Sequence, residues 1–275
     1  MKTYQLAWLQ DSWRCWLTWL LLAGIFATVC VFLSQWQFNR RTEALVKIDR
    51  VVQNFDQPAL PIEQLVPRDK FDSENEWRQV TLSGHFLIED AVLVRNRPNN
   101  GQPGFLQLIP FISDAGKIYA IETGWIPTGE KQDYPDAVAM PSAADRQIIA
   151  RIRAAEPSLN RNAPSGQIAT INIESLIAKT QVSNSIYKRV YFSLAQKYNN
   201  QRLPILTSRP QMNEGNHLSY ALQWILFALM AFAALWWAIK QELRARQIAL
   251  DPNFVPKKRF KVGDLDKAIE DSATS

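Results

Sequence analysis

The chain has 275 residues, a net charge of +5 from 31 Lys and Arg against 26 Asp and Glu, and a mildly polar mean hydropathy of −0.19. The middle of the chain, Trp36 to Asn216, contains no basic run interleaved with aromatic residues, which argues against nucleic-acid binding. The two cysteines, Cys15 and Cys30, both lie near the N-terminus. That position excludes a disulfide framework, a CxxC redox pair and a thiolate metal site from the rest of the chain. The average hydropathy hides two apolar blocks, one near each end.

The first apolar block, Cys15 to Ser34, contains no charged residue. A helix of this length crosses about 30 Å of hydrocarbon. Trp13 precedes the block and Trp36 follows it, as expected for rings at the two membrane–water interfaces. A cleaved signal peptide would have a shorter apolar region and a small-residue cleavage site. We therefore predict an uncleaved transmembrane helix in which both cysteines are small apolar residues facing lipid.

The second apolar block, Leu218 to Ile239, is again uncharged and long enough to span a bilayer. Basic residues follow it closely: Lys240, Arg244, Arg246, Lys257, Lys258, Arg259 and Lys261. The positive-inside rule places these residues in the cytoplasm, and two spans then place the N-terminus there as well. The predicted organisation is a cytoplasmic N-terminus (1–14), a first transmembrane helix (15–34), an extracytoplasmic domain (35–216), a second transmembrane helix (217–239) and a basic cytoplasmic tail (240–275).

The stretch between the two blocks reads as a soluble domain rich in strands. The domain is predicted to begin with an amphipathic helical extension from Trp36 to about Gln53, followed by a linker (56–67) that prolines interrupt. Strands are predicted at 76–86, 91–94, 105–111, 117–125, 146–152 and 185–194, with a hairpin turn at 114–116. A short helix is predicted at 172–180 with Asn172 as N-cap, and an extended segment from Pro204 to Pro210. This pattern predicts a β-dominated α+β domain, either a barrel or a curved antiparallel sheet.

No phosphate loop, dinucleotide fingerprint, zinc motif or nucleophile elbow is present, so we predict no catalytic residues and no enzyme activity. Of the two histidines, His85 lies in a predicted strand and is expected to be structural. His217 borders the second apolar block, where helical spacing groups it with Tyr220, Ala221 and Trp224. An imidazole beside an aromatic face suits the iron of a flat macrocycle. The alternative is an interfacial histidine within an aromatic belt.

Five motifs, in order and with this topology, carry a resemblance to a known family. Leu33–Arg40 is similar to L-G-x-W-Q-x-x-R, Trp77–Phe86 to W/Y-R-x-V-x-L-x-G-x-F, Arg95–Pro110 to an R…G-x-x-G…P stretch, Thr123–Pro127 to R-G-W-V-P, and Asn216–Trp224 to N-H-x-x-Y-A-x-x-W. The chain resembles bacterial-type members of the Surfeit locus protein 1 family, assembly factors of haem-copper cytochrome c oxidase. Ser34 replaces the usual glycine and Thr123 the usual arginine. Gly124 is kept, which suggests a backbone with positive φ.

The resemblance implies a protein of the cell inner membrane that assists delivery of haem a to cytochrome c oxidase subunit I. It implies haem binding at His217, with membrane lipid as surroundings and haem A synthase as a further partner. To this we add a geometric prediction: His217 and Trp36 lie at the same membrane depth, with Tyr220 and Trp224 beside the haem. The haem propionates would meet Arg40 or Arg41, although plain interfacial placement of these arginines fits equally well.

Two other functions compete with haem delivery. A scaffold would stabilise oxidase subunits during assembly without ever ligating haem. A haem-modifying enzyme is disfavoured, because the chain lacks a second histidine in the membrane segments and any redox or nucleotide motif.

Overall fold

The structure is a computed structural model that describes residues 3–67, 70–144, 146–159, 161–181, 186–197 and 204–250. The chain forms two compact units. One contains Met1–Thr42 and Gly215–Ser275, and the other contains Glu43–Glu214. The predicted tail beyond Leu250, with Lys257, Lys258, Arg259 and Lys261, lies outside the described residues.

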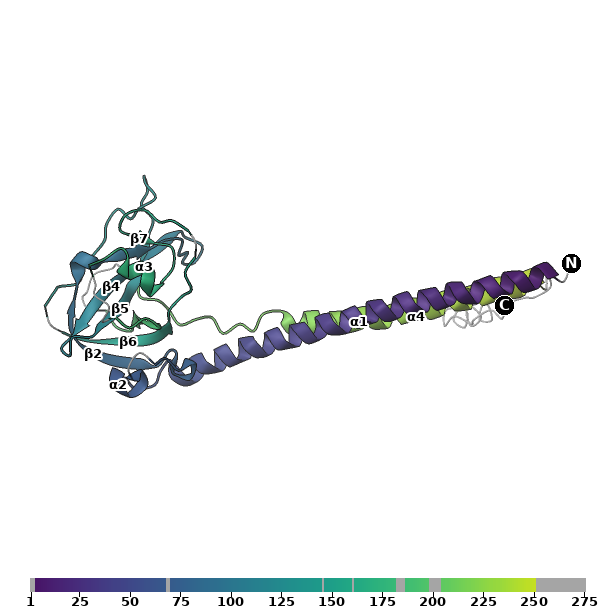
Figure 1. The fold of residues 1–275 in the computed structure, drawn as a ribbon, viewed down its shortest axis with the longest axis horizontal. Coiled ribbons are helices and arrows are strands. Elements are labelled where there is room, and N and C mark those ends of the chain that lie inside the picture. Colours follow the sequence, from purple (N-terminus) through teal and green to yellow (C-terminus); the bar gives the residue numbers. More distant parts are fainter. Residues whose placement is uncertain are drawn as a thin grey trace, which may run out of the picture. The chain divides into compact units, whose positions relative to one another are not determined.

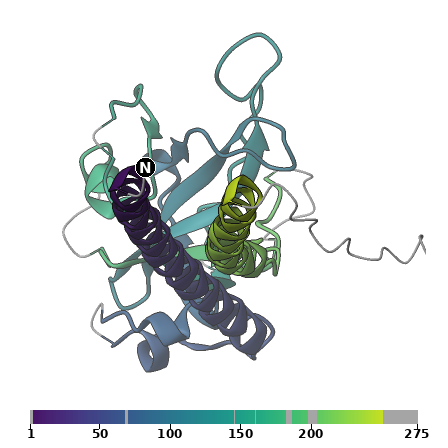
Figure 2. The ribbon, with the colours of Figure 1, turned by 90° about the vertical axis from the view of Figure 1, so that its right-hand side faces the viewer.

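The first unit is a pair of helices, the N-terminal part of α1 (Thr3–Asn54) and α4 (His217–Leu250), which lie side by side (Figures 1 and 2). Both helices are long and apolar enough to cross a membrane. Large apolar side chains such as Leu21 and Phe32 are 63% and 71% exposed, as expected for surfaces that face lipid. The predicted helical extension after Trp36 is confirmed, because α1 continues without a break to Asn54.

Most of the residues in the contact between the two helices are small. The less exposed positions recur every three or four residues, at Ala23, Ala27, Cys30, Ser34 and Gln37 on α1 and at Ala221, Trp224, Ala228, Ala231, Leu235 and Ala238 on α4. The Ser34 hydroxyl donates a hydrogen bond of 3.0 Å to the Ala221 carbonyl oxygen. Small side chains let helix backbones approach closely in a membrane. Cys30 is fully buried in this seam, so the prediction that it faces lipid was wrong, whereas Cys15 is exposed.

The second unit is a β-barrel. Its strands are β1 (Leu60–Pro61), β2 (Gln79–Phe86), β3 (Val92–Val94), β4 (Gly104–Ser113), β5 (Ile118–Pro127), β6 (Arg146–Ala154), β7 (Gln167–Ile168) and β8 (Val190–Leu194), with short helices α2 (Ile62–Leu65) and α3 (Ile173–Ile177). The sheet order is β1-β2-β6-β8-β5-β4-β3-β7, and pairing of β2 with β4 closes it. The predicted barrel is confirmed, but β5 and β8 run parallel, so the sheet is mixed rather than antiparallel.

Alternation along the strands sorts the barrel side chains into two cores. One core joins Val80, Leu82, Phe86, Ile109, Phe111, Tyr119, Ile121, Ile148, Ala150, Ile152, Phe192 and Leu194 from the five strands that close the barrel. The second core includes Leu108 and Ala120, which point to the opposite face of β4 and β5, and is completed by Ile173 and Leu176 of α3. Fully burying one such aliphatic or aromatic side chain contributes about 1.5–3 kcal/mol, so both faces of β4 and β5 stabilise the fold.

Several predicted element boundaries shift for local reasons. β2 begins at Gln79 rather than residue 76 because Trp77 has a φ of 73°, which interrupts an extended strand. The Asn172 side chain accepts a hydrogen bond from the Ser175 N–H, confirming the predicted N-cap of α3. The last strand keeps only Val190–Leu194, while Ile186 makes a single bridge and residues 182–185 lie outside the described chain.

Thr123 and Gly124 lie within β5, where its pairing with β4 shifts register between Gln107 and Leu108, and a distant segment joins the barrel beside them. Gly124 has a φ of +138°, and a Cβ there would lie 2.5 Å from the Ile205 carbonyl oxygen. Ile205 instead pairs with Trp125 through two backbone hydrogen bonds of 2.7 and 2.8 Å. The predicted positive φ of Gly124 is therefore confirmed, and the glycine also permits this close approach.

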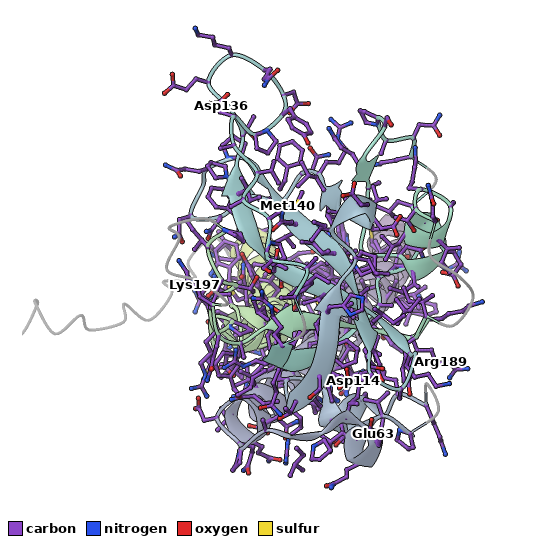
Figure 3. The ribbon with its side chains drawn as sticks, turned by 90° about the vertical axis from the view of Figure 1, so that its left-hand side faces the viewer. Glu63, Asp114, Asp136, Met140, Arg189 and Lys197 are labelled. Atoms are coloured by element: carbon purple, nitrogen blue, oxygen red, sulfur yellow. The ribbon has the colours of Figure 1, made fainter. Side chains whose placement is uncertain are left out.

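Thr123, which replaces the family's usual arginine, is fully buried. Its hydroxyl donates to Gln107 Oε1 at 2.5 Å, and Gln107 Nε2 donates to the Ala139 carbonyl oxygen at 3.0 Å. Met140 follows Ala139 and lies over the sheet, while Asp136 lies out in the same loop (Figure 3). The neutral Thr123 hydroxyl thus binds Gln107 of β4, and Gln107 in turn binds the loop that follows β5.

The end of α1 is fastened to the barrel by aromatic rings and arginines. Phe55 and Trp77 pack together with ring centroids 5.9 Å apart. Arg151 and Arg153 of β6 lie over these two rings, at 3.8 and 3.7 Å from the Phe55 and Trp77 centroids. Arg209, from the segment before α4, lies 5.0 Å from the Phe55 centroid. Phe55 therefore joins α1, β6 and the segment around Arg209 within the second unit.

Glu122 of β5 is buried in the second unit, and the Thr207 hydroxyl donates to its Oε1 at 2.9 Å. Burial raises the pKa of Glu122 above its ordinary value of 4.5, and hydrogen bonds from Ser193 and Thr207 offset this only in part. The folded protein thus retains a proton that the unfolded chain releases near pH 4.5. The stability from this group is complete below that pH and falls as pH rises toward the folded pKa.

Glu122→Gln is therefore expected to reduce the loss of stability as pH rises above 4.5. The difference in slope between wild type and variant is at most about 1.4 kcal/mol per pH unit. Denaturant unfolding from pH 4.5 to 8 measures it, with Glu63→Gln as a control at an exposed carboxyl. Equal slopes for wild type and Glu122→Gln would show that the Glu122 proton does not contribute.

Candidate functional site

His217 is the first residue of α4 and lies directly against α1. Its Nδ1 is 2.9 Å from Gln37 Oε1, a contact between residues 180 positions apart in sequence. One turn further along α4, Ala221 is fully buried and its carbonyl receives the Ser34 hydrogen bond. Gln37 contacts His217, and Ser34 contacts Ala221. Residues three or four positions apart lie on the same face of a helix, so the two contacts lie one turn apart along the same seam. The heptad-like seam therefore places the imidazole.

The Gln37 contact determines which imidazole nitrogen is available. The donor and acceptor roles in this contact depend on the imidazole tautomer. Because an amide oxygen only accepts hydrogen bonds, the contact favours the neutral tautomer with its proton on Nδ1. Nε2 then has a free lone pair, the arrangement found in metal-ligating histidines whose other nitrogen is held by an oxygen acceptor. A Cβ added to Gly215 would lie 3.4 Å from Nε2 and Cδ2. Glycine therefore keeps a side chain away from the ligand edge of the ring.

The structure separates the other predicted site residues. Trp36 precedes Gln37 and thus lies at the level of His217, with 55% of its side chain exposed. Tyr220 is 49% exposed, whereas Trp224 is half-buried and meets Phe227 edge-on at 5.7 Å. The predicted aromatic strip is therefore not a single surface, because Trp224 lies in the contact with α1 whereas Tyr220 lies on the exposed side of α4.

Arg40 lies about one turn beyond Trp36 on α1 and is exposed, while Arg41 is half-buried. A guanidinium at this position is at the polar end of the helix pair, since the apolar block ends at Ser34. His217 and Trp36 therefore lie at the same level of the helix pair, and Arg40 lies further along α1. Its predicted role toward a propionate stays a prediction.

Gln37 is the residue that sequence reasoning missed. It lies in the Leu33–Arg40 motif, but a polar side chain near a membrane surface gives no sign of its partner. The signal that could have found it is helical spacing. Gln37 lies three residues after Ser34, and His217 lies four residues before Ala221, so each pair lies on one face of its helix. His85, by contrast, is half-buried in β2 opposite Ile112. Within the described part of the chain, no group of three or more His, Cys, Asp or Glu could hold a metal ion.

These features define a class: a membrane protein in which two transmembrane helices flank a β-barrel domain, with one histidine at the entry of the second helix. Residues 24–229 match the SURF1 family. The chain belongs to the SURF1 family, as its motifs indicated.

Similar proteins come from several organisms. An uncharacterized SURF1-like protein of Mycobacterium bovis is 28% identical over 241 residues, covering 84% of this chain and 86% of the relative. The cytochrome oxidase assembly protein SHY1 of Saccharomyces cerevisiae is 27% identical over 142 residues, covering 49% of this chain and 36% of that protein. A SURF1-like protein of Rickettsia bellii is 25% identical over 133 residues, covering 44% of this chain and 53% of the relative.

Proposed function

We propose that this chain is an assembly factor for haem-copper cytochrome c oxidase that assists delivery or insertion of haem a into subunit I. Membership of the SURF1 family and the similarity to the yeast cytochrome oxidase assembly protein SHY1 support the oxidase assembly role. The observation that supports haem delivery is the His217–Gln37 contact of 2.9 Å, which leaves Nε2 as a free ligand. This role includes no catalytic step.

Haem a would be held as cargo. His217 would bind the iron through Nε2, and the hydrogen bond to Gln37 would fix the ring orientation and increase its basicity. Tyr220 and Trp36 offer exposed aromatic surface beside it, and Trp224 a half-buried ring. Arg40 would form a charge-assisted hydrogen bond with a propionate.

A single protein ligand suits transfer better than storage. The chain contains two histidines, and the other, His85, belongs to the barrel strand β2. A single bond from His217 would leave the iron able to bind a ligand of the acceptor. Subunit I is the proposed acceptor, and haem A synthase the proposed donor.

The proposed location is the cell inner membrane, with two spans in contact with lipid and both termini in the cytoplasm. Lys240, Arg244 and Arg246 follow the second apolar block and support this orientation through the positive-inside rule. The barrel would then lie on the outer side of the membrane. Cysteine accessibility to an impermeant reagent, introduced as Lys117→Cys in a Cys15→Ser/Cys30→Ser background, tests it: labelling in intact spheroplasts supports this side, and labelling only after lysis contradicts it.

Gln37→Leu is expected to weaken haem binding by about 10–100-fold, because loss of an outer-shell hydrogen bond to a ligating histidine has this effect. The measurement is a haem titration of the full-length protein in detergent, followed by absorbance. Gln35→Leu is the matched control, since among the described residues the Gln35 side chain hydrogen-bonds only to Asn39 of the same helix, at 3.2 Å. Equal affinities for the two variants would contradict the role given to Gln37.

The alternative is a scaffold that stabilises oxidase subunits without binding haem. Arg151 and Arg209 lie over the Phe55 ring and hold it against the barrel. A scaffold needs a rigid surface of this kind, so these contacts favour the scaffold function. Cells lacking the gene, complemented with wild type or His217→Ala, separate the two functions. Under haem delivery, His217→Ala leaves the oxidase poor in haem a, whereas under scaffolding it restores the oxidase fully. No effect of gene deletion on oxidase haem content would contradict both.

A further inference from the structure

A pocket of about 350 Å³ lies within the barrel unit. It is formed where the segment after β3 meets the segment after β6. Its charged and polar lining consists of Arg95, Asn96, Arg97, Glu156, Arg161, Asn162 and Thr170. Three guanidiniums therefore share a small concave site with one carboxylate.

Backbone pairing fixes the first two arginines. Arg95 N–H donates to the Ile168 carbonyl oxygen at 3.1 Å, and Arg97 N–H donates to the Gly104 carbonyl oxygen at 2.9 Å. Asn96, between them, has a φ of 56°, in the left-handed region that Asn tolerates better than most residues. The two arginines are thus held by neighbouring strands rather than by a loop alone.

Glu156 is already satisfied. Arg97 binds it with both terminal nitrogens, and the Ile171 N–H donates to its Oε2 at 2.9 Å. Burial raises the pKa of Glu156, but these hydrogen bonds outweigh burial and the net pKa is lowered. The carboxylate therefore stays ionised and neutralises Arg97 alone.

The other two guanidiniums keep donors to spare. Arg95 pairs through Nη2 with Asp133, which is 75% exposed, and such pairs with an exposed partner are weak. Its Nε is buried and makes no hydrogen bond to any described residue. Arg161 has no ion pair within the described ranges. The pocket thus has unused cationic donors beside one that is neutralised.

We propose that this pocket binds an aliphatic carboxylate. Guanidiniums present planar paired donors that match a carboxylate. Leu159, which is 47% exposed, and Ala169 complete the lining and give apolar surface for a carbon stem. The stem distinguishes this ligand from inorganic phosphate, which would use the charge but not the apolar wall. The carboxylate would come from a glutamate side chain of a partner polypeptide or from a free dicarboxylate. This site is independent of haem binding.

Titration of the full-length protein in detergent micelles tests the proposal. Arginine is labelled with ¹⁵N, and the Nε–H resonances of Arg95 and Arg161 are assigned from Arg95→Lys and Arg161→Lys. The probes are glutarate, glutamate blocked at both backbone ends, and inorganic phosphate, all at constant ionic strength. We expect saturable shifts of both resonances with a carboxylate probe. Arg95→Gln/Arg161→Gln is expected to weaken binding at least about tenfold, measured from barrel amide shifts, and Lys117→Gln to leave it unchanged.

The probes separate the sources of the ligand. Saturation by blocked glutamate supports a polypeptide side chain, and saturation by glutarate alone supports a free dicarboxylate. Phosphate binding as tight as that of either carboxylate would overturn the assignment, as would shifts that do not saturate. Unchanged affinity in Arg95→Gln/Arg161→Gln, with the folded barrel confirmed by its amide spectrum, would overturn it too.

Discussion

Gly124→Ala is expected to destabilise the barrel by about 2–4 kcal/mol. A backbone outside the common regions costs about 1–3 kcal/mol for a residue with a side chain, and Gly124 has a φ of +138°. The new Cβ would also lie 2.5 Å from the Ile205 carbonyl oxygen, so the segment around Ile205 must move away. That movement would break the paired hydrogen bonds of Ile205 with Trp125. Thermal unfolding followed by near-UV circular dichroism measures the loss.

Gly116→Ala is the matched control for strain without overlap. Gly116 also has a positive φ, +70°, but a Cβ there would meet nothing within 4 Å. The expected cost is about 1–2 kcal/mol, the usual price of a left-handed conformation for a residue other than glycine. If both alanine variants lost the same stability, the close approach of Ile205 to Gly124 would have no energetic effect.

His217→Ala is expected to remove haem binding altogether within the measurable range. The substitution deletes the proposed iron ligand itself, so the loss should exceed the about 10–100-fold expected for an outer-shell partner such as Gln37. The measurement is the haem content of full-length protein purified from cells that make haem a. Because α4 begins at His217, far-UV circular dichroism checks that the helix is intact.

His85→Ala is the control for nonspecific loss of haem. His85 is the only other histidine of the chain and lies in the barrel strand β2. The variant is expected to retain the wild-type haem content. Retention by His217→Ala, or equal loss in both variants, would remove His217 from the site.

The large features of the fold could be predicted because they depend on long, uniform patterns. Two uncharged apolar blocks and alternating strands indicate spanning helices and a β-rich domain without knowledge of tertiary contacts. β1 and β7 were not predicted because each has two residues, too few to show an alternation. The parallel pairing of β5 with β8 was also missed, because Ile121 and Phe192 meet across a long sequence separation.

The candidate site could be predicted only in part. His217 stands out because histidines are rare here and it borders an apolar block. The orientation of its ring could not be foreseen, because it depends on Gln37, from a helix at the other end of the chain. Cys30 shows the same limit: its burial against α4 follows from helix pairing, which composition does not reveal.

The absorption spectrum of the wild-type protein tests the central proposal most directly. Full-length protein would be purified in mild detergent from cells able to make haem a, and its spectrum recorded in the oxidised and reduced states. Haem delivery predicts bound haem a, with bands that change on reduction as expected for an iron with a histidine ligand. Protein that is free of haem at every stage of purification, from cells with normal haem a synthesis, would contradict it.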